Sequence, residues 1–75
     1  MRELVELMAR NLVDFPDEVR VREVEGGRGV VYELSVAPSD MGKIIGKSGR
    51  IVRSMRAIVA AAGYDEQRRA SIEIV

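Results

Sequence analysis

A pair of glycines three residues apart, Gly46 and Gly49, interrupts the second half of this chain of 75 residues. Apolar residues recur with helical spacing on both sides of the pair, so the sequence predicts two helices joined by a tight turn. The second helix is expected to begin near Gly49. The free N–H groups at its N-terminus, with Lys47 beside them, suit a phosphate group. The turn therefore constrains the fold and marks the first candidate site.

Three segments have the period-two alternation of apolar and polar residues that is typical of β-strands. Residues 19–25 and 30–37 are the first two, and the glycine-rich loop 26–29 between them predicts a β-hairpin. Val24 breaks the alternation, which indicates a bulge or a frayed end. Residues 71–75 are expected to form the closing strand. One face of the second strand would carry Val30, Tyr32, Leu34 and Val36.

Three other segments have the apolar spacing of amphipathic helices. Residues 2–14 form the first, and the Phe-Pro pair after it ends it, because the residue before a proline avoids the helical region. A short helix over residues 40–45 is expected next, with Ser39 as its N-cap and Asp40 near the positive end of its dipole. The third helix is expected to end at Gly63. Its core-facing stripe would be Ile51, Val52, Met55, Ile58, Val59 and Ala62.

The predicted order is therefore α-β-β-α-α-β within a single domain, residues 1–75. Three strands need one apolar face covered, and three amphipathic helices on one side can cover it. The hairpin strands are antiparallel, whereas the last strand arrives by a helical crossover. The expected fold class is an α+β two-layer sandwich with a three-stranded mixed sheet covered on one face by three helices.

The composition excludes several kinds of chemistry. The chain has no cysteine and no histidine, which removes disulfides, thiol catalysis, the usual zinc sites and imidazole bases. No nucleophile–base pair is evident, so we expect no enzyme, no catalytic residue, no metal, no cofactor and no small-molecule substrate. No apolar run is long enough to span a membrane and no signal peptide is evident, so a cytoplasmic protein without a membrane partner is expected.

The charges are distributed unevenly although they sum to zero. Residues 1–40 hold five basic and nine acidic side chains, a net charge of −4, whereas residues 41–75 hold seven basic and three acidic, a net charge of +4. From residue 41 to residue 64 there are five basic side chains and no acidic one. Such asymmetry indicates a surface for a polyanion.

Three interpretations of the loop Gly46–Gly49 compete. A nucleotide P-loop would need glycine where Met41 stands and would follow a buried strand directly, so it is excluded. A plain structural corner is the second interpretation, and loop 26–29, which repeats the same glycine spacing inside a hairpin, shows how little that spacing says alone. The basic, acid-free surroundings of the loop favour the third interpretation, a clamp on a nucleic-acid backbone.

The segment I-I-G-K-S-G-R-I-V, residues 44–52, resembles the [IV]-I-G-x-x-G-x-x-[IV] signature of the KH domain. The preceding α-β-β order is that of the type II, prokaryotic version. The likeness extends over the whole chain, because LVDFPDEVRV early and VAPSDMGKIIGKSGRIVRSMR later are similar to the KhpA family of small bacterial KH proteins.

The resemblance implies a non-enzymatic protein that binds about four unpaired RNA nucleotides, with the loop clamping the sugar-phosphate backbone. Lys47 would supply charge and Ser48 a hydroxyl group, between the glycines at 46 and 49. Ile44, Ile45 and Val52 would be partly core and partly groove floor, which Leu34 and Val36 extend; the further phosphate contacts would be Lys43, Arg50 and Arg53. Three or four neutralised phosphates give a salt dependence of log K of only about −2 to −3.

The resemblance also implies an assembly. Proteins of this family are associated with a homodimer, or with a second KH protein of the KhpB/Jag type, and with work as RNA chaperones or post-transcriptional regulators. The alternative function is a KH-fold protein-interaction module with little or no RNA binding.

Overall fold

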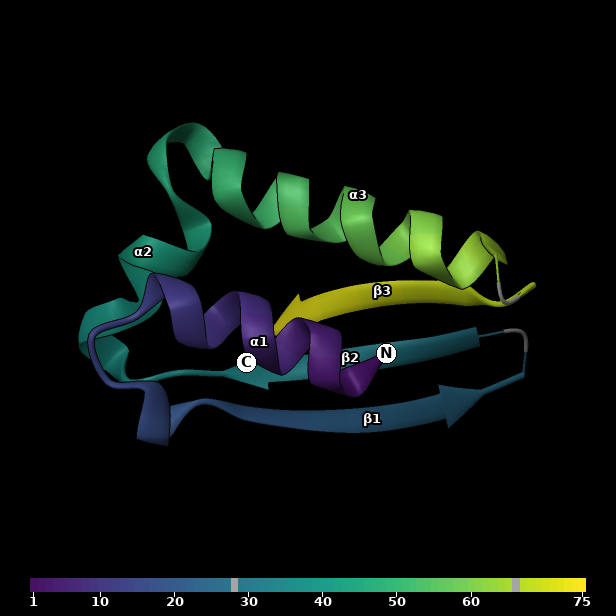
Figure 1. The fold of residues 1–75 in the computed structure, drawn as a ribbon, viewed down its shortest axis with the longest axis horizontal. Helices are drawn as coiled ribbons and strands as arrows, with labels where there is room; N and C mark the ends of the chain where they lie inside the picture. Colours follow the sequence, from purple (N-terminus) through teal and green to yellow (C-terminus); the bar gives the residue numbers. More distant parts are fainter. Residues whose placement is uncertain (28, 66) are drawn as a thin grey trace.

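The computed structural model describes residues 1–27, 29–65 and 67–75, without the side chain of Asp65 (Figure 1). Helices and strands follow the predicted order α-β-β-α-α-β, which is confirmed. The elements are α1 (Arg2–Leu12), β1 (Arg20–Gly26), β2 (Gly29–Ser35), α2 (Met41–Ile45), α3 (Arg50–Asp65) and β3 (Arg69–Ile74). Three short 3-10 turns, at Pro16–Glu18, Pro38–Asp40 and Lys47–Gly49, connect them.

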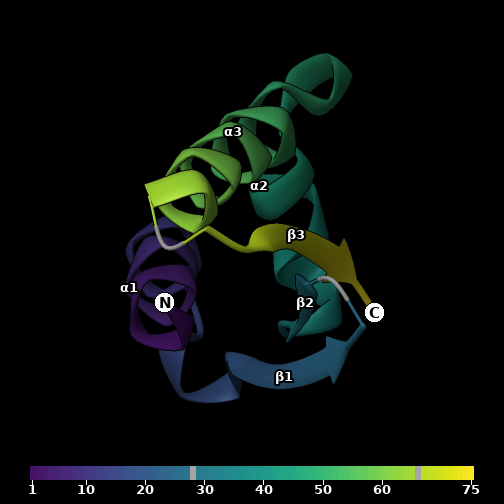
Figure 2. The same ribbon diagram turned by 90° about the vertical axis from the view of Figure 1, so that its right-hand side faces the viewer.

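The sheet has the strand order β1-β2-β3, with β2 in the centre. Strands β1 and β2 pair antiparallel and β2 and β3 pair parallel, so the predicted mixed sheet is confirmed. Helix α3 makes the crossover that a parallel pair requires. Figure 2, viewed nearly along the strands, shows the helices on one side of the sheet and the other side bare. The α+β two-layer arrangement is therefore confirmed.

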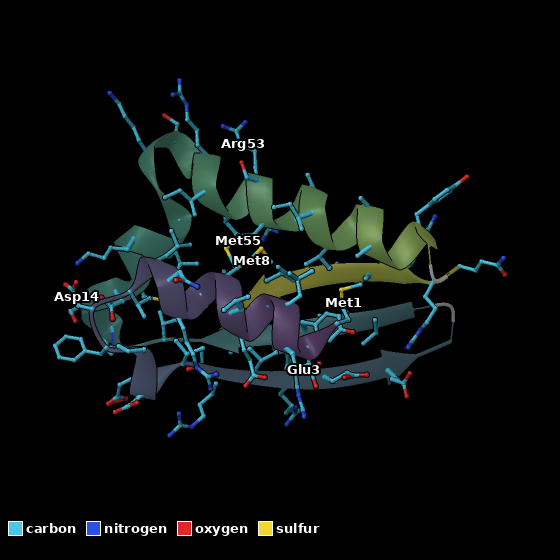
Figure 3. The ribbon with its side chains drawn as sticks, viewed as in Figure 1. Met1, Glu3, Met8, Asp14, Arg53 and Met55 are labelled. Carbon is cyan, nitrogen blue, oxygen red and sulfur yellow. The ribbon has the colours of Figure 1, made fainter. Side chains whose placement is uncertain are left out.

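The core lies between the central strand and the helices. On β2, Val30, Tyr32 and Leu34 are buried while the residues between them are only half-buried, as the alternation predicts. The helices and β3 cover these side chains with Val5, Ala9, Met55, Val59 and Ile72. Met55 of α3 belongs to this core and Met8 of α1 packs against it; both are labelled in Figure 3.

Helix α1 is shorter than predicted, and the reason lies 26 residues away. It ends at Leu12 instead of residue 14, because the carboxylate of Asp40 accepts the backbone N–H groups of Asp14 and Phe15, each at 3.1 Å. Asp40 is fully buried, so it anchors the connection that leads into β1. The N-cap prediction for Ser39 is wrong, since Pro38–Asp40 forms a 3-10 turn without a side-chain cap hydrogen bond.

Helix α3 is longer than predicted. It passes through Gly63 and ends at Asp65, and a Cβ added at Gly63 would come within 2.6 Å of the carbonyl oxygen of Arg68. Gly63 therefore permits the close approach of the chain entering β3 and does not end the helix. The core prediction for Ile58 is also wrong, because its side chain is 48% exposed. Successive helical residues differ by about 100°, and Ile58 lies that far around α3 from the fully buried Val59.

Strand β1 shows no bulge at Val24. Its pairing with β2 is continuous from Arg20, opposite Ser35, to Gly26, opposite Gly29. Val24 instead contributes to the bare face of the sheet, where it lines a shallow hollow of about 470 Å³ together with Val31 of β2.

Among the residues that the structure describes, no helix is both long enough and apolar enough to cross a membrane.

Candidate nucleic-acid interface

The Gly46–Gly49 loop joins α2 to α3 in a conformation that needs glycine. Gly46 has φ 75° and ψ 175°, a region of backbone conformation that is essentially restricted to glycine. Gly49 has φ 73°, and Ser48 between them has φ 56° and ψ 26°, a left-handed conformation that is uncommon for a residue with a side chain. One 3-10 turn over Lys47–Gly49 then leads into α3, which begins at Arg50 as expected.

The hydrogen bonds of the loop decide which of its N–H groups remain free. Gly46 donates to Gly42 O at 2.8 Å, Gly49 to Gly46 O at 3.1 Å, and Arg50 to Lys47 O. Within the described part of the chain, the N–H groups of Lys47 and Ser48 have no acceptor. The carbonyl groups of Gly46 and Lys47 face the start of α3, where they accept the N–H groups of Gly49 and Arg50. Because a trans peptide holds its C=O and N–H on opposite sides, the N–H groups of Lys47 and Ser48 point away from the start of α3. They form the outward-facing end of the loop.

We predict that the two glycines of the loop differ in how well they tolerate a side chain. At Gly46 an added Cβ would lie 2.7 Å from Cγ1 of Ile51, whereas at Gly49 it would meet nothing within 4 Å. Gly46→Ala should therefore lower the free energy of unfolding by about 3 kcal/mol, from the forbidden backbone conformation and the clash together. Gly49→Ala should cost only about 1 kcal/mol, from its positive φ. Urea unfolding of both variants checks this, and equal losses would contradict it.

Lys43 does not belong to the free basic surface that the sequence suggests. Its Nζ lies 2.5 Å from Oδ2 of Asp14 and 3.9 Å from Oδ1 of Asp40. The hydrogen bond that its ammonium donates to Asp14, with the nearby charges of Asp14 and Asp40, raises the pKa of Lys43. Its charge is thus already opposed by two carboxylates. Asp14 was missed by sequence reasoning, because only the packing of α2 against the end of α1 brings the two residues together.

The other basic residues around the loop divide into two kinds. Lys47 and Arg50 are exposed and have no ion-pair or hydrogen-bond partner for their side chains in residues 1–27, 29–65 and 67–75. Arg53 is engaged with the loop itself: it donates to Ser48 O at 2.9 Å and to Gly49 O at 3.4 Å (Figure 3). The structure therefore brings Lys47, Arg50 and Arg53 together, but it leaves only the first two unpaired.

The apolar residues beside the loop are more deeply buried than predicted. Ile44 is fully buried and Val52 is buried, so both support the loop from inside the core. Ile45 is 39% exposed and supplies the apolar surface next to Gly46. Leu34 and Val36 are also buried in the core, so their predicted role as groove floor is wrong. The alternation of β2 places Leu34 on the face that the helices cover, and Val36, just after the strand, belongs to the same buried cluster.

Arg56 of α3 lies outside the candidate site that the sequence predicts. Its Nε donates to Ile72 O at 3.3 Å, and so ties α3 to β3, the strand at the outer edge of the sheet. The helical spacing did not indicate this contact, because it depends on where β3 passes along the helix.

Among the described residues, no group of three or more potential metal ligands comes together.

Nearly the whole chain is similar to known proteins. The family model described as KhpA/KhpB, KH domain, matches residues 2–74. The chain is 49% identical to RNA-binding protein KhpA of Clostridium acetobutylicum over the full length of both proteins. It is 48% identical to the KhpA of Aquifex aeolicus and 44% identical to that of Chlamydia pneumoniae, covering all of this chain and 95% and 96% of theirs. No solved structure matches it significantly.

Proposed function

The chain belongs to the KhpA/KhpB family of KH domains, and on that premise we propose that it binds single-stranded RNA through the Gly46–Gly49 loop. The observation that carries this proposal is the pair of outward-facing N–H groups at Lys47 and Ser48, beside two unpaired cationic side chains. Such groups suit the phosphates of a nucleic-acid backbone. The curated relatives named above are RNA-binding proteins, which supports RNA as the polyanion.

In this proposal the loop clamps the backbone and does not read base edges. One phosphate accepts the two free N–H groups and the Ser48 hydroxyl, with the Lys47 ammonium close by. Arg50, in the first turn of α3, neutralises a neighbouring phosphate. Because glycine has no Cβ, the backbone at Gly49 can approach the sugar-phosphate chain closely. Ile45 offers its exposed apolar surface to a base, as about four unpaired nucleotides pass the loop.

We further propose that useful affinity requires a second module. The two cations that the described residues leave unpaired beside the loop neutralise few phosphates, so one domain binds weakly. A homodimer, or a heterodimer with a KhpB/Jag-like KH protein, would place two loops on one RNA and raise the avidity without any new contact. The family model spans KhpA and KhpB alike, which supports this kind of pairing. Work as an RNA chaperone or post-transcriptional regulator, without enzymatic activity, fits such binding, and the cytoplasmic location stays a prediction.

RNA binding can be tested directly by fluorescence anisotropy with an unstructured oligoribonucleotide of about 12 residues. We expect binding that falls with salt, with a slope of log K against log salt of about −1.4 to −2.1 for two or three phosphates. This is shallower than the sequence suggested, because Lys43 is paired with Asp14. The same RNA annealed to its complement should bind more weakly, since duplex bases are not splayed for the loop. Absence of binding at 50 mM salt or less would contradict the proposal.

A protein-interaction module is the alternative. The observation that favours it is a set of large apolar side chains left in solvent on the two long helices: Leu7 of α1 is 59% exposed and Ile58 of α3 is 48% exposed. Exposed apolar surface is a feature of protein interfaces. Under this alternative, Leu7→Ser with Ile58→Ser would abolish partner binding in a protein that shows no affinity for RNA at any salt concentration.

A further inference from the structure

We propose that Arg53 is a positioning residue, which holds the Gly46–Gly49 loop in its RNA-binding conformation and does not itself contact a phosphate. The inference rests on the proposed function, and it changes the role that the sequence suggested for this residue. The carbonyl groups of Ser48 and Gly49 both accept hydrogen bonds from the Arg53 guanidinium, at 2.9 Å and 3.4 Å.

The position of Arg53 in α3 explains how it reaches these carbonyls. Side chains of an α-helix tilt towards its N-terminus, over the turn that precedes their own Cα. Arg53 lies four residues after Gly49, one helical turn, so its side chain folds back over the loop. A guanidinium carries several N–H donors in a fixed planar fork, and here two of them serve neighbouring carbonyls.

These two hydrogen bonds control the orientation of the loop peptides. The peptide that joins Ser48 to Gly49 has its C=O held by Arg53 and its N–H held by Gly46 O, so it is fixed at both ends. Without Arg53 the left-handed conformation of Ser48, at φ 56°, would lose the contact that offsets its cost of about 1 kcal/mol. A rotation there would also turn carbonyl oxygens, with their partial negative charge, towards the phosphate.

Arg50 is the matched control for Arg53. Both are arginines in the first turn of α3, and both side chains are exposed. Of the two side chains, only that of Arg53 has hydrogen bonds to the loop, whereas the Arg50 side chain has no partner in the described part of the chain. A phosphate ligand and a positioning residue respond differently to the same substitution. Losing a phosphate contact reduces the salt slope by about 0.7 for a single strand, whereas losing the loop geometry lowers affinity without changing the number of contacts.

The test compares four variants: Arg53→Lys, Arg53→Gln, Arg50→Lys and Arg50→Gln. Lysine keeps the charge but cannot reproduce the planar fork. We expect Arg53→Lys to lower RNA affinity about fivefold with an unchanged salt slope. Arg50→Lys should lower the affinity less, also with an unchanged slope, because its ammonium still meets the phosphate as a point charge. Arg50→Gln should reduce the slope by about 0.7, and Arg53→Gln should leave it unchanged. Wild-type affinity in Arg53→Lys, with a slope reduced in Arg53→Gln, would overturn the proposal and make Arg53 a phosphate ligand.

A second measurement needs no RNA, so it separates this inference from the proposed function. In the free protein, amide chemical shifts of Lys47 and Ser48, which are adjacent to neither arginine, should move in both Arg53 variants and stay in place in both Arg50 variants. Resonances of core residues such as Val59 report whether the fold is intact. Unmoved loop resonances in Arg53→Gln would refute the positioning role, whether or not the wild type binds RNA. If the loop resonances move while the wild type fails to bind RNA, the proposed function fails and the positioning role stands.

Discussion

Replacing Lys47 and Ser48 together with aspartate is expected to lower the affinity for single-stranded RNA by at least about 100-fold, or about 2.7 kcal/mol. The substitution removes one cation. It also places two carboxylates beside the N–H groups that would donate to the phosphate. Both side chains are exposed, and aspartate is among the residues that tolerate the left-handed conformation of Ser48. The circular dichroism spectrum and the melting temperature should therefore stay near those of the wild type, while anisotropy reports the loss of binding.

The chain offers a control with the same change of charge. Arg69 and Ser71 are exposed on β3, on the bare face of the sheet and away from the loop. Arg69→Asp with Ser71→Asp makes the net charge equally more negative, and we expect it to reduce RNA affinity by less than about threefold. Equal losses in the two double variants would mean that RNA responds to overall charge and not to the loop, and unchanged affinity in the loop variant would refute the proposed site.

Replacing Asp40 with alanine is expected to destabilise the fold by about 3–5 kcal/mol. Its carboxylate accepts two backbone N–H groups, those of Asp14 and Phe15, and the side chain is only 1% exposed. Removing it leaves two partly buried donors without an acceptor, and each costs about 1–3 kcal/mol. A domain of this size has a total stability of about 4–11 kcal/mol, so much of it would be lost. Urea unfolding monitored by circular dichroism measures the difference.

Asp14→Ala is the matched control, because Asp14 contributes a carboxylate to the same cluster from the surface. Its ion pair with Lys43 is exposed on both sides, and such pairs contribute about 0–1 kcal/mol. In this variant the backbone N–H of residue 14 still donates to the carboxylate of Asp40. A loss of less than 1 kcal/mol in Asp40→Ala, or similar losses in both variants, would show that the anchoring of the α1–β1 connection is not what Asp40 provides.

The parts of the fold that could be predicted are those that depend on neighbours in sequence. The alternation of Val30, Tyr32 and Leu34 identified the central strand, and Met55 and Val59 marked the inner face of α3. These patterns were readable because a strand or a helix repeats its burial along its own length. Ile58 shows where that reasoning stops: a helical stripe gives a direction, but the width of the surface that covers it decides whether the edge of the stripe is buried.

The candidate site was predictable in position and less so in detail. The glycines at 46 and 49 and the basic residues around them indicated where a phosphate would bind. The pairing of Lys43 with Asp14, 29 residues away, and the buried anchor at Asp40 were not predictable, because charge patterns along a sequence do not say which side chains meet. The hydrogen bonds of Arg53 are local in sequence, yet they depend on the positive φ of Ser48. A serine in the sequence does not indicate that its φ is positive.

The sequence by itself determined the order of the elements, the central strand, the helix–loop–helix around Gly46 and Gly49, and the resemblance to KH domains, because each follows from short-range spacing. Only the tertiary structure decided which cations are free. Among the cations beside the loop, Lys43 is opposed by Asp14 and Asp40, and Arg53 is engaged by two carbonyls of the loop. Within the residues that the structure describes, the side chains of Lys47 and Arg50 are the ones there that remain unpaired. The physical reason is that a charged side chain acts through what lies within a few ångströms of it, and distances between residues far apart in sequence exist only once the chain has folded.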